Sequence, residues 1–344
     1  MLEQFIGQQL WLGIGFSVVI LFMLALDLGL LNRQAHTPTY REAVTWSSVW
    51  VTLALCFAGV IFWRLGSVKG AEFLTGYVIE LSLSVDNLFV FLLIFSYFKV
   101  PSQYQHRVLF WGVLGALVMR VTIILLGTAL ITKFHWILYF FGAFLIYTGI
   151  KMMVHEDDDI APEDNAAVKI LTRYVPIVRR YEGEQFFTVE NGRRVGTLLF
   201  LVLFIVEVSD LIFAVDSIPA VFGITQDPFI VYTSNVFAIL GLRSLFFLLA
   251  GVIEKFHYLK IGLSVVLTLI GVKMLAEPFV IGTLVGKNTL IFISLGAVAV
   301  ILLASAGASV LWPKDAETNI EVDLPPDFDP PFADEESADG PEKQ

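Results

Sequence analysis

The amino-acid sequence predicts an all-α membrane protein with about nine transmembrane helices, six of which form an inverted three-plus-three helix repeat. Composition, recurring long apolar segments and an internal duplication support this prediction. Hydrophobic residues make up 57% of the 344-residue chain and charged residues only 16%, whereas a soluble domain carries about a quarter. A water-soluble core of this size could not bury so much apolar surface, so the chain belongs in a lipid bilayer.

Apolar segments of roughly 20 residues, the length needed to cross a bilayer, recur along the whole chain. They are expected at 11–31, 45–63, 71–98, 108–132, 134–153, 195–222, 229–250, 257–276 and 288–312. The first segment has no basic stretch before it and no small-residue cleavage site after it. We therefore expect a retained helix there rather than a signal peptide.

Two short motifs occur twice at a separation of 122 residues, and two charged landmarks extend the register with separations of 123 and 124. The corresponding sites are Lys133–Trp136 and Lys255–Tyr258, Gly149–Met152 and Gly271–Met274, Arg120 and Arg243, and Asp86 and Asp210. Each unit contains three helices, and an odd number places the second unit upside down in the membrane. Inverted repeats of this kind are typical of secondary transporters, whose ion site lies near the bilayer midplane.

These segments divide the chain into six parts. Residues 1–70 hold the first two helices, 71–153 the first unit, 154–194 a cytoplasmic loop, 195–276 the second unit and 277–314 the ninth helix. In the loop, Asn191 and Gly192 between β-prone stretches predict a hairpin. Residues 315–344 contain the whole net charge of −10, and we expect a disordered acidic tail. This charge argues against a nucleic-acid partner.

Lys and Arg residues are concentrated in the connections after the first, third, fifth and seventh segments, above all in 154–194. Because such positive charge marks the cytoplasmic side, we expect the N-terminus outside and the C-terminus in the cytoplasm. The lipid bilayer is thus one partner of this multi-pass chain.

Several carboxylates lie inside the predicted spans, where an ionised side chain costs about 2.5–3.5 kcal/mol on insertion scales. They are Glu80 and Asp86 in the third segment, Glu207, Asp210 and Asp216 in the sixth, and Asp27 near the end of the first. Polar neighbours that could supply further ligands are Ser82, Ser84, Asn87, Ser209, Ser217 and Asn235. Corresponding depths of Asp86 and Asp210 in the two units would bring both to one central cavity.

Carboxylate, amide and hydroxyl oxygens without thiolate or imidazole suit a hard divalent cation such as Mg²⁺, Ca²⁺ or Mn²⁺. The single cysteine, Cys56, excludes an intramolecular disulfide and a cysteine-based metal site. Pro219 removes the helical partner of the Val215 carbonyl, which leaves either a cation ligand or a simple kink. Arg120 and Arg243 are either structural partners of the acids or replacements for the ion's charge when the site is empty.

Three acidic or polar stretches resemble the TerC/Alx family of bacterial integral membrane proteins. They are Glu80–Phe91, Glu207–Val221 and Asp227–Leu249, and the loop segment Gly183–Arg194 is similar as well. The resemblance covers about residues 10–310. It implies a location in the bacterial inner membrane and export of Mn²⁺ from the cytoplasm, with the five central acids as the family's motif residues. The family name comes from tellurium resistance.

The leading hypothesis is a secondary transporter that exports Mn²⁺ in exchange for H⁺ or Na⁺, with no tightly bound cofactor. The alternative is a membrane biogenesis factor that supplies Mn²⁺ to translocated proteins, and whether the chain forms a homo-oligomer or binds a translocase stays open. An intramembrane aspartyl protease is not favoured, because the sequence lacks a G-x-G-D motif and has too many central acids. We therefore do not expect an enzyme.

Overall fold

The computed structural model describes residues 13–20, 23, 40–154, 166–190, 192–249, 257–280 and 286–311, and these are almost entirely helical. Residues 13–20 and 23 are helical as well. The longer elements are α2 (Tyr40–Leu65), α3 (Ser67–Tyr97), α4 (Ser102–Lys133), α5 (Ile137–Val154), α6 (Ala166–Tyr174), β1 (Phe187–Glu190), β2 (Arg193–Gly196), α7 (Leu198–Phe222), α8 (Pro228–Leu249), α9 (His257–Val280) and α10 (Lys287–Leu311).

Seven of the described helices are long and apolar enough to cross a membrane: α2, α3, α4, α5, α7, α9 and α10. The described part therefore supports an all-α membrane protein with seven candidate spans, rather than the nine that the sequence predicts. Helix α8 contributes a shorter apolar stretch, Pro228–Leu242, and most of the predicted first span lies outside the described residues. Asp27, the acidic tail and the Arg243 side chain also lie outside them.

Local chemistry explains where several helices begin. The Thr197 hydroxyl accepts a hydrogen bond from the Phe200 backbone N–H and caps α7. Asp227 caps α8 in the same way, since its carboxylate accepts from the Phe229 N–H at 3.1 Å, and Pro228 suits the first helical position. Helix α7 continues through Pro219 to Phe222, so the structure has no break in α7 at this proline.

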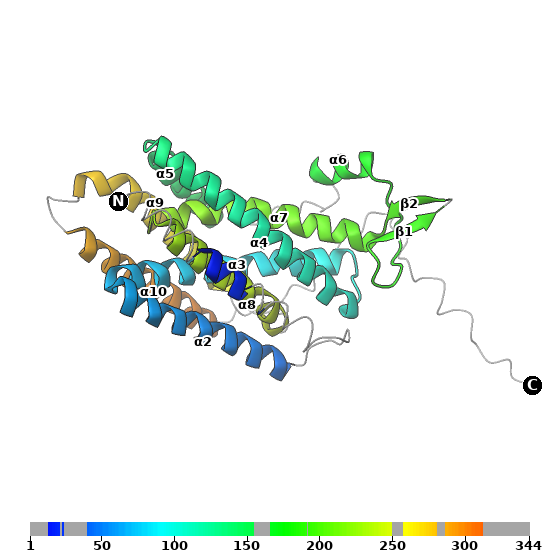
Figure 1. The fold of residues 1–344 in the computed structure, drawn as a ribbon, viewed down its shortest axis with the longest axis horizontal. Helices are drawn as coiled ribbons and strands as arrows, with labels where there is room; N and C mark the ends of the chain where they lie inside the picture. Colours follow the sequence, from blue (N-terminus) through cyan, green and yellow to red (C-terminus); the bar gives the residue numbers. More distant parts are fainter. Residues whose placement is uncertain are drawn as a thin grey trace, which may run out of the picture.

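The helices run roughly along one common direction, as Figure 1 shows. Helix α3 packs against α8 and α7, and α4 packs against α7 and α8 in turn. Helices α5 and α9 cross closely, α2 covers α3 and α8, and α10 lies against α9 and α3. Large buried side chains such as Phe73, Leu88, Leu199 and Ile230 fill the contacts among α3, α7 and α8 and their neighbours. Helices α3, α4 and α7 thus enclose the centre of the bundle.

At one end of the bundle, α6 and a two-stranded sheet project beside the start of α7 (Figure 1). Strand β1 pairs antiparallel with β2, and Glu190 lies opposite Arg193. The hairpin predicted from the Asn-Gly pair therefore forms, with Gly192 at a positive φ of 76° in the turn.

Candidate functional site

A buried cluster of three charged side chains joins the middles of α3, α4 and α7. The Arg120 Nη1 donates to Glu80 Oε2 at 2.5 Å, and Nη2 donates to Asp210 Oδ1 at 3.2 Å. A further bond runs from Arg120 Nε to Asp210 Oδ2 at 3.4 Å. All three side chains are at most 4% exposed. One guanidinium thus lies between two carboxylates, and the ionised cluster has a net charge of −1.

Several polar atoms near the same helices are buried without any hydrogen-bond partner among the described residues. They are Glu80 Oε1, Ser84 Oγ, Asn87 Nδ2, and both amide atoms of Asn235. The four residues are at most 3% exposed. Buried polar groups are nearly always hydrogen-bonded, so unpartnered ones at an acidic centre are typical of a site for an ion or ordered water. We define Glu80, Arg120, Asp210, Ser84, Asn87, Ser217 and Asn235 as the central site.

Helical periodicity explains which predicted residues reach this site. Ser84 and Asn87 follow Glu80 by four and seven residues, so all three share one face of α3. Ser217 follows Asp210 by seven residues, and its hydroxyl lies 3.4 Å from Arg120 Nη1. Each helix therefore directs a polar stripe toward the bundle centre.

Asp86 and Asp216 lie off these stripes. Each follows the central acid of its helix by six residues, which places it more than 100° round the helix axis. Both are half-buried instead of buried. Within the described residues, no group of three His, Cys, Asp or Glu side chains is close enough to hold a metal ion. The structure thus unites Glu80 and Asp210 through Arg120 and does not gather all five predicted acids into one metal cluster.

Glu207 occupies a neighbouring niche between α7 and α4. Its carboxylate lies directly against Gly115, where any side chain on α4 would overlap it. Glu207 is half-buried and three residues before Asp210, so the two acids face the same side of α7. Gly115 therefore provides the space that this carboxylate needs.

A second polar cluster, which the sequence analysis missed, lies at the end of the bundle where α3 begins. Lys69 Nζ lies 2.8 Å from Glu72 Oε2 and 3.1 Å from Asp227 Oδ2. The Thr225 hydroxyl donates to Glu72 Oε2 at 2.7 Å. These four residues, which we call the α3 end cluster, tie α3 to the α7–α8 connection. The signal in the sequence was Glu72, an acid at the second position of the third predicted span.

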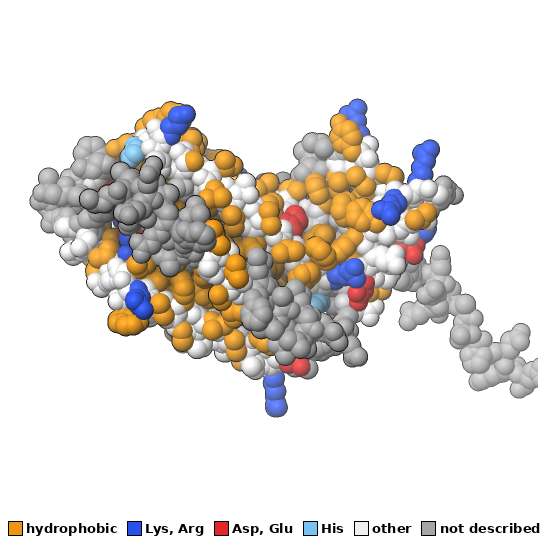
Figure 2. All heavy atoms as spheres, viewed as in Figure 1, with side chains coloured by type: hydrophobic (Ala, Val, Ile, Leu, Met, Phe, Trp, Pro, Cys, Tyr) orange, Lys and Arg blue, Asp and Glu red, His pale blue; other side chains and the backbone are white. Residues whose placement is uncertain are grey.

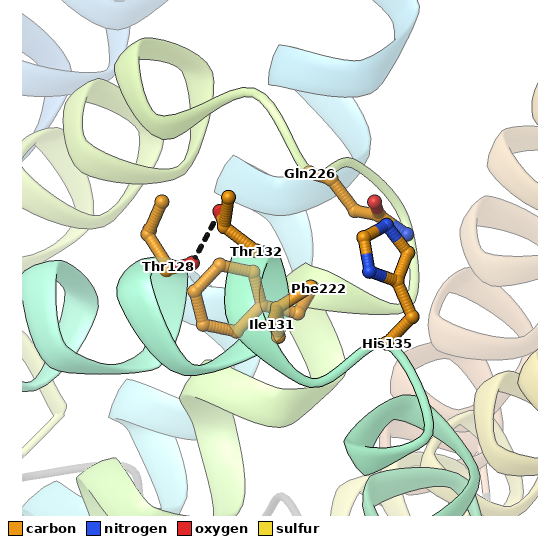
Figure 3. Close-up of a pocket in the computed structure, with 6 residues that line it drawn as sticks. All are labelled: Thr128, Ile131, Thr132, His135, Phe222 and Gln226. Atoms are coloured by element: carbon orange, nitrogen blue, oxygen red, sulfur yellow. Dashed lines mark hydrogen bonds between the residues drawn. The ribbon is translucent and has the colours of Figure 1, made fainter.

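A small pocket of about 100 Å³ opens beside this cluster. Thr128, Ile131 and Thr132 of α4 line it together with His135, Phe222 and Gln226. Figure 3 shows His135 and Gln226 side by side and the two threonines at the opposite side of the pocket. Its lining combines four polar residues with Ile131 and Phe222, and Gln226 directly follows Thr225 in the chain.

The sequence of this chain matches the family model described as "Integral membrane protein TerC family" over residues 65–317. This match spans α3 to α10 and contains the complete central site. The chain belongs to the TerC family. The family assignment agrees with the resemblance seen in the acidic motifs of α3 and α7.

Relatives of this TerC-family chain are similar over most of their length. An uncharacterized membrane protein of Myxococcus xanthus, STKORF319, is 49% identical over 311 residues, which is 90% of this chain and 95% of that protein. Alx of Escherichia coli (strain K12), named as a membrane-bound redox modulator, is 52% identical over 274 residues, covering 77% and 85%. The chloroplastic thylakoid membrane protein TERC of Arabidopsis thaliana is 46% identical over 255 residues, covering 74% and 66%. No solved structure matches the chain.

Proposed function

We propose that this TerC-family protein is a secondary transporter that exports a hard divalent cation, Mn²⁺, from the cytoplasm. The observation that carries the proposal is the position of Arg120 between Glu80 and Asp210, on helices whose buried polar atoms include several without a hydrogen-bond partner in the described part of the chain. A cation held by two carboxylates would satisfy the same acids that the guanidinium satisfies here. The central site therefore has the acidic groups of a cation site, and Arg120 supplies the positive charge that balances them.

The donor set favours a hard cation. Two carboxylates, two amides and two hydroxyls line the central site, and such oxygens suit Mg²⁺, Ca²⁺ or Mn²⁺. The choice of Mn²⁺ among them rests on the family resemblance. A dithiol redox reaction is not favoured for this chain, although one relative is named as a redox modulator, because the sequence has a single cysteine.

An inverted repeat that relates α3–α5 to α7–α9 accounts for the packing. With the repeat offset of 122 residues, Gly142 in the first unit corresponds to Ser264 in the second, and Gly149 corresponds to Gly271. A two-fold relation then requires the contact of Gly142 with Gly271 to be matched by one of Gly149 with Ser264. Both contacts exist: a Cβ on Gly142 would lie 3.1 Å from the Gly271 carbonyl oxygen, and one on Gly149 would lie 2.8 Å from that of Ser264.

Helix pairing supports the same relation. Helix α3 packs on α8 as α4 packs on α7, and these two interfaces are exchanged by the repeat. In such transporters the substrate site lies at the repeat interface near the midplane, and access alternates as one unit moves against the other. Asp210 lies about 18 Å along α7 from Phe222, which corresponds to the middle of a bilayer-spanning helix.

In the proposed cycle, Arg120 alternates with the transported ion. With the ion absent, the guanidinium neutralises Glu80 and Asp210, so the empty carrier can reorient with little uncompensated charge in the membrane. When Mn²⁺ enters, Arg120 leaves at least one carboxylate, because the ion and the guanidinium cannot both occupy the space between the acids. In the present arrangement Arg120 lies between both acids, and every charged group of the cluster is at most 4% exposed, as the occluded step of this cycle requires.

Orientation and location follow from the same proposal. The excess of Lys and Arg in 154–194 supports a cytoplasmic α6 and hairpin, and hence an outer position for the α3 end cluster. The bacterial relatives are named as membrane proteins, and the inner membrane is the location that export from the cytoplasm requires.

Purified full-length protein in proteoliposomes provides the test. We expect saturable Mn²⁺ flux in the parent, weaker flux of Zn²⁺, and loss of Mn²⁺ flux in Glu80→Gln with the protein still correctly inserted. The matched control is Glu182→Gln, outside the spans, which should transport normally. Absence of Mn²⁺ flux from well-folded parent protein would contradict the exporter hypothesis and favour the alternative, a factor that supplies Mn²⁺ to translocated proteins.

A further inference from the structure

The hairpin presents an apolar face that the described part of the chain covers only in part. On β1, Phe187 and Val189 point to the same side and are 50% and 66% exposed. The cross-strand partner of Val189 is Arg194, which is exposed as well. Val195, on the opposite side of the sheet, is 7% exposed. One face of the hairpin thus packs on the protein, while the other, with Phe187, Val189 and Arg194, is partly exposed.

The hairpin is fixed at the level where the membrane-spanning helices end. The Phe187 ring lies 4.6 Å from the ring of Phe200 in the first turn of α7. Thr197, the residue before α7, donates its hydroxyl to the Gln185 carbonyl at 2.7 Å. Since α7 is a candidate span from Leu198 onward, this places Phe187 beside the boundary of the apolar layer.

Two further contacts hold the same segment to the ends of α3 and α4. The Tyr181 hydroxyl donates to the Phe98 carbonyl at 2.7 Å, and burial raises the pKa of this phenol, so it remains a donor. Arg107 of α4 lies 2.9 Å from Glu184 and over the ring of Phe186. The segment from Tyr181 to Thr197, which we call the platform, is therefore held against the ends of α3, α4 and α7. Its outer face cannot turn inward without breaking these contacts.

The charge around this face is positive. The three acids in the described part of the platform, Glu182, Glu184 and Glu190, are all paired with arginines, namely Arg180 and Arg107. Three exposed arginines are left without an ion pair among the described residues: Arg173, Arg193 and Arg194. Figure 2 shows blue basic side chains and orange apolar side chains together at this end of the molecule.

We propose that this face, Phe187, Val189 and Arg194, is a binding surface for anionic phospholipid headgroups of the adjoining leaflet, with the exposed Arg173 of α6 and Arg193 of β2 adding positive charge to the same end of the molecule. Since α7 is a candidate span from Leu198 onward and Phe187 contacts Phe200 in its first turn, this face would continue the lipid-facing surface of α7. In such a surface the apolar side chains would contact the upper part of the acyl chains, and the arginines would bind the phosphate groups above them. The surface is independent of the proposed transport activity.

The test uses full-length protein with Cys56→Ser and Val189→Cys, labelled at the new cysteine with an environment-sensitive fluorophore. It is reconstituted in vesicles of phosphatidylcholine alone or with 30% phosphatidylglycerol, each with or without a lipid bearing a nitroxide near its headgroup. We expect a blue shift and at least twofold stronger nitroxide quenching in the phosphatidylglycerol vesicles. A label at Leu125→Cys on α4, which is 62% exposed within a candidate span, is the control for uniform lipid contact and should respond equally in both vesicles.

A second variant separates headgroup binding from simple proximity to lipid. Combining Arg173→Gln, Arg193→Gln and Arg194→Gln should abolish the difference between the two vesicle types, whereas Arg64→Gln on α2 should leave it unchanged. Equal quenching of the parent in both vesicles would overturn the proposal. So would a blue shift that grows with the protein-to-lipid ratio, since this would assign the face to a second copy of the chain. Full access of an aqueous quencher in the phosphatidylglycerol vesicles would also overturn it.

Discussion

Arg120 binds both carboxylate oxygens of Asp210, through Nη2 at 3.2 Å and Nε at 3.4 Å, while its remaining nitrogen binds Glu80. Such a two-point contact fixes the guanidinium plane relative to α7. Because α3, α4 and α7 contribute one member each, any movement between the helices changes this contact first. The relationship therefore couples the charge of the site to the packing of the helices around it.

The first prediction concerns Arg120→Gln. Removing one partner of a buried ion pair costs roughly 3–5 kcal/mol, because the remaining charges lose their compensation. We expect a lower melting temperature in metal-free detergent solution and a larger recovery with Mn²⁺ than the parent shows, since the site charge changes from −1 to −2. Net export should slow, because the empty carrier lacks its counter-charge during return. Thermal melting and proteoliposome flux measure both effects.

The double variant Arg120→Gln with Asp210→Asn is the control for this prediction. It restores the parental site charge of −1 and should regain part of the lost stability without regaining transport. If Arg120→Gln shows parental kinetics and an unchanged response to Mn²⁺, with only a lower melting temperature, the arginine has a structural role alone.

The second prediction concerns the two acids that the repeat relates. Asp210→Asn keeps the volume and one oxygen but removes a charge of the central site that a buried divalent ion needs. It should abolish Mn²⁺ export without loss of folding, whereas Asp86→Asn, on another face of α3, and Asp27→Asn should be milder. The measurement is intracellular manganese and survival of an exporter-deficient bacterium, with membrane levels checked by blot. Full protection by Asp210→Asn, or loss of export in Asp86→Asn alone, would contradict the assignment of the ion to the central site.

The third prediction concerns the α3 end cluster. Thr225→Val removes a hydroxyl donor from the buried Glu72, and a hydrogen bond to a charged group contributes about 1.5–3 kcal/mol. We expect a measurably lower melting temperature than for the parent. Thr122→Val is the matched control, because that exposed hydroxyl bonds only to the Val118 carbonyl of its own helix. Equal melting temperatures of the two variants would show that Glu72 does not depend on Thr225.

The sequence predicted the spans well because hydropathy is a property of a segment by itself. It placed the ends less well: α3 begins at Ser67, since Lys69 and Glu72 can remain helical when they pair with Asp227 and Thr225. That pairing joins residues far apart in the chain, and no local sequence pattern indicates it. Glu72 was overlooked for this reason, although its acidity within a predicted span was visible.

The central acids show a different limit of prediction from the sequence. Their presence at membrane depth predicted a polar centre, and a structural pairing with the acids was one of the two roles considered for Arg120. Which acids it joins depends on the rotation of α3, α4 and α7, which hydropathy does not determine. The six-residue spacing of Asp86 from Glu80, and of Asp216 from Asp210, already indicated separate helix faces. Treating all five acids as one cluster neglected this periodicity.

The fourth prediction tests the crossing of α5 and α9. A Cβ on Gly271 would lie 2.6 Å from the Gly142 carbonyl oxygen, which is backbone and cannot move aside. Gly271→Ala should force the helices apart and, as overpacking typically does, cost about 1–3 kcal/mol. Gly296→Ala on α10, where nothing lies within 4 Å, should be neutral in the same thermal assay. A Gly271 variant as stable as the Gly296 variant would contradict the close crossing.

The last prediction concerns Gly115, whose missing side chain leaves room for the Glu207 carboxylate. Gly115→Ala would fill this niche, and the flexible end of Glu207 should turn away with little loss of stability. If Glu207 serves the central site, Mn²⁺ flux should fall several-fold while the melting temperature changes only slightly. Gly112→Ala, one turn away on α4, meets only Val206 at 3.4 Å and is the matched control. Equal flux in the two variants would show that the position of the Glu207 carboxylate does not matter for transport.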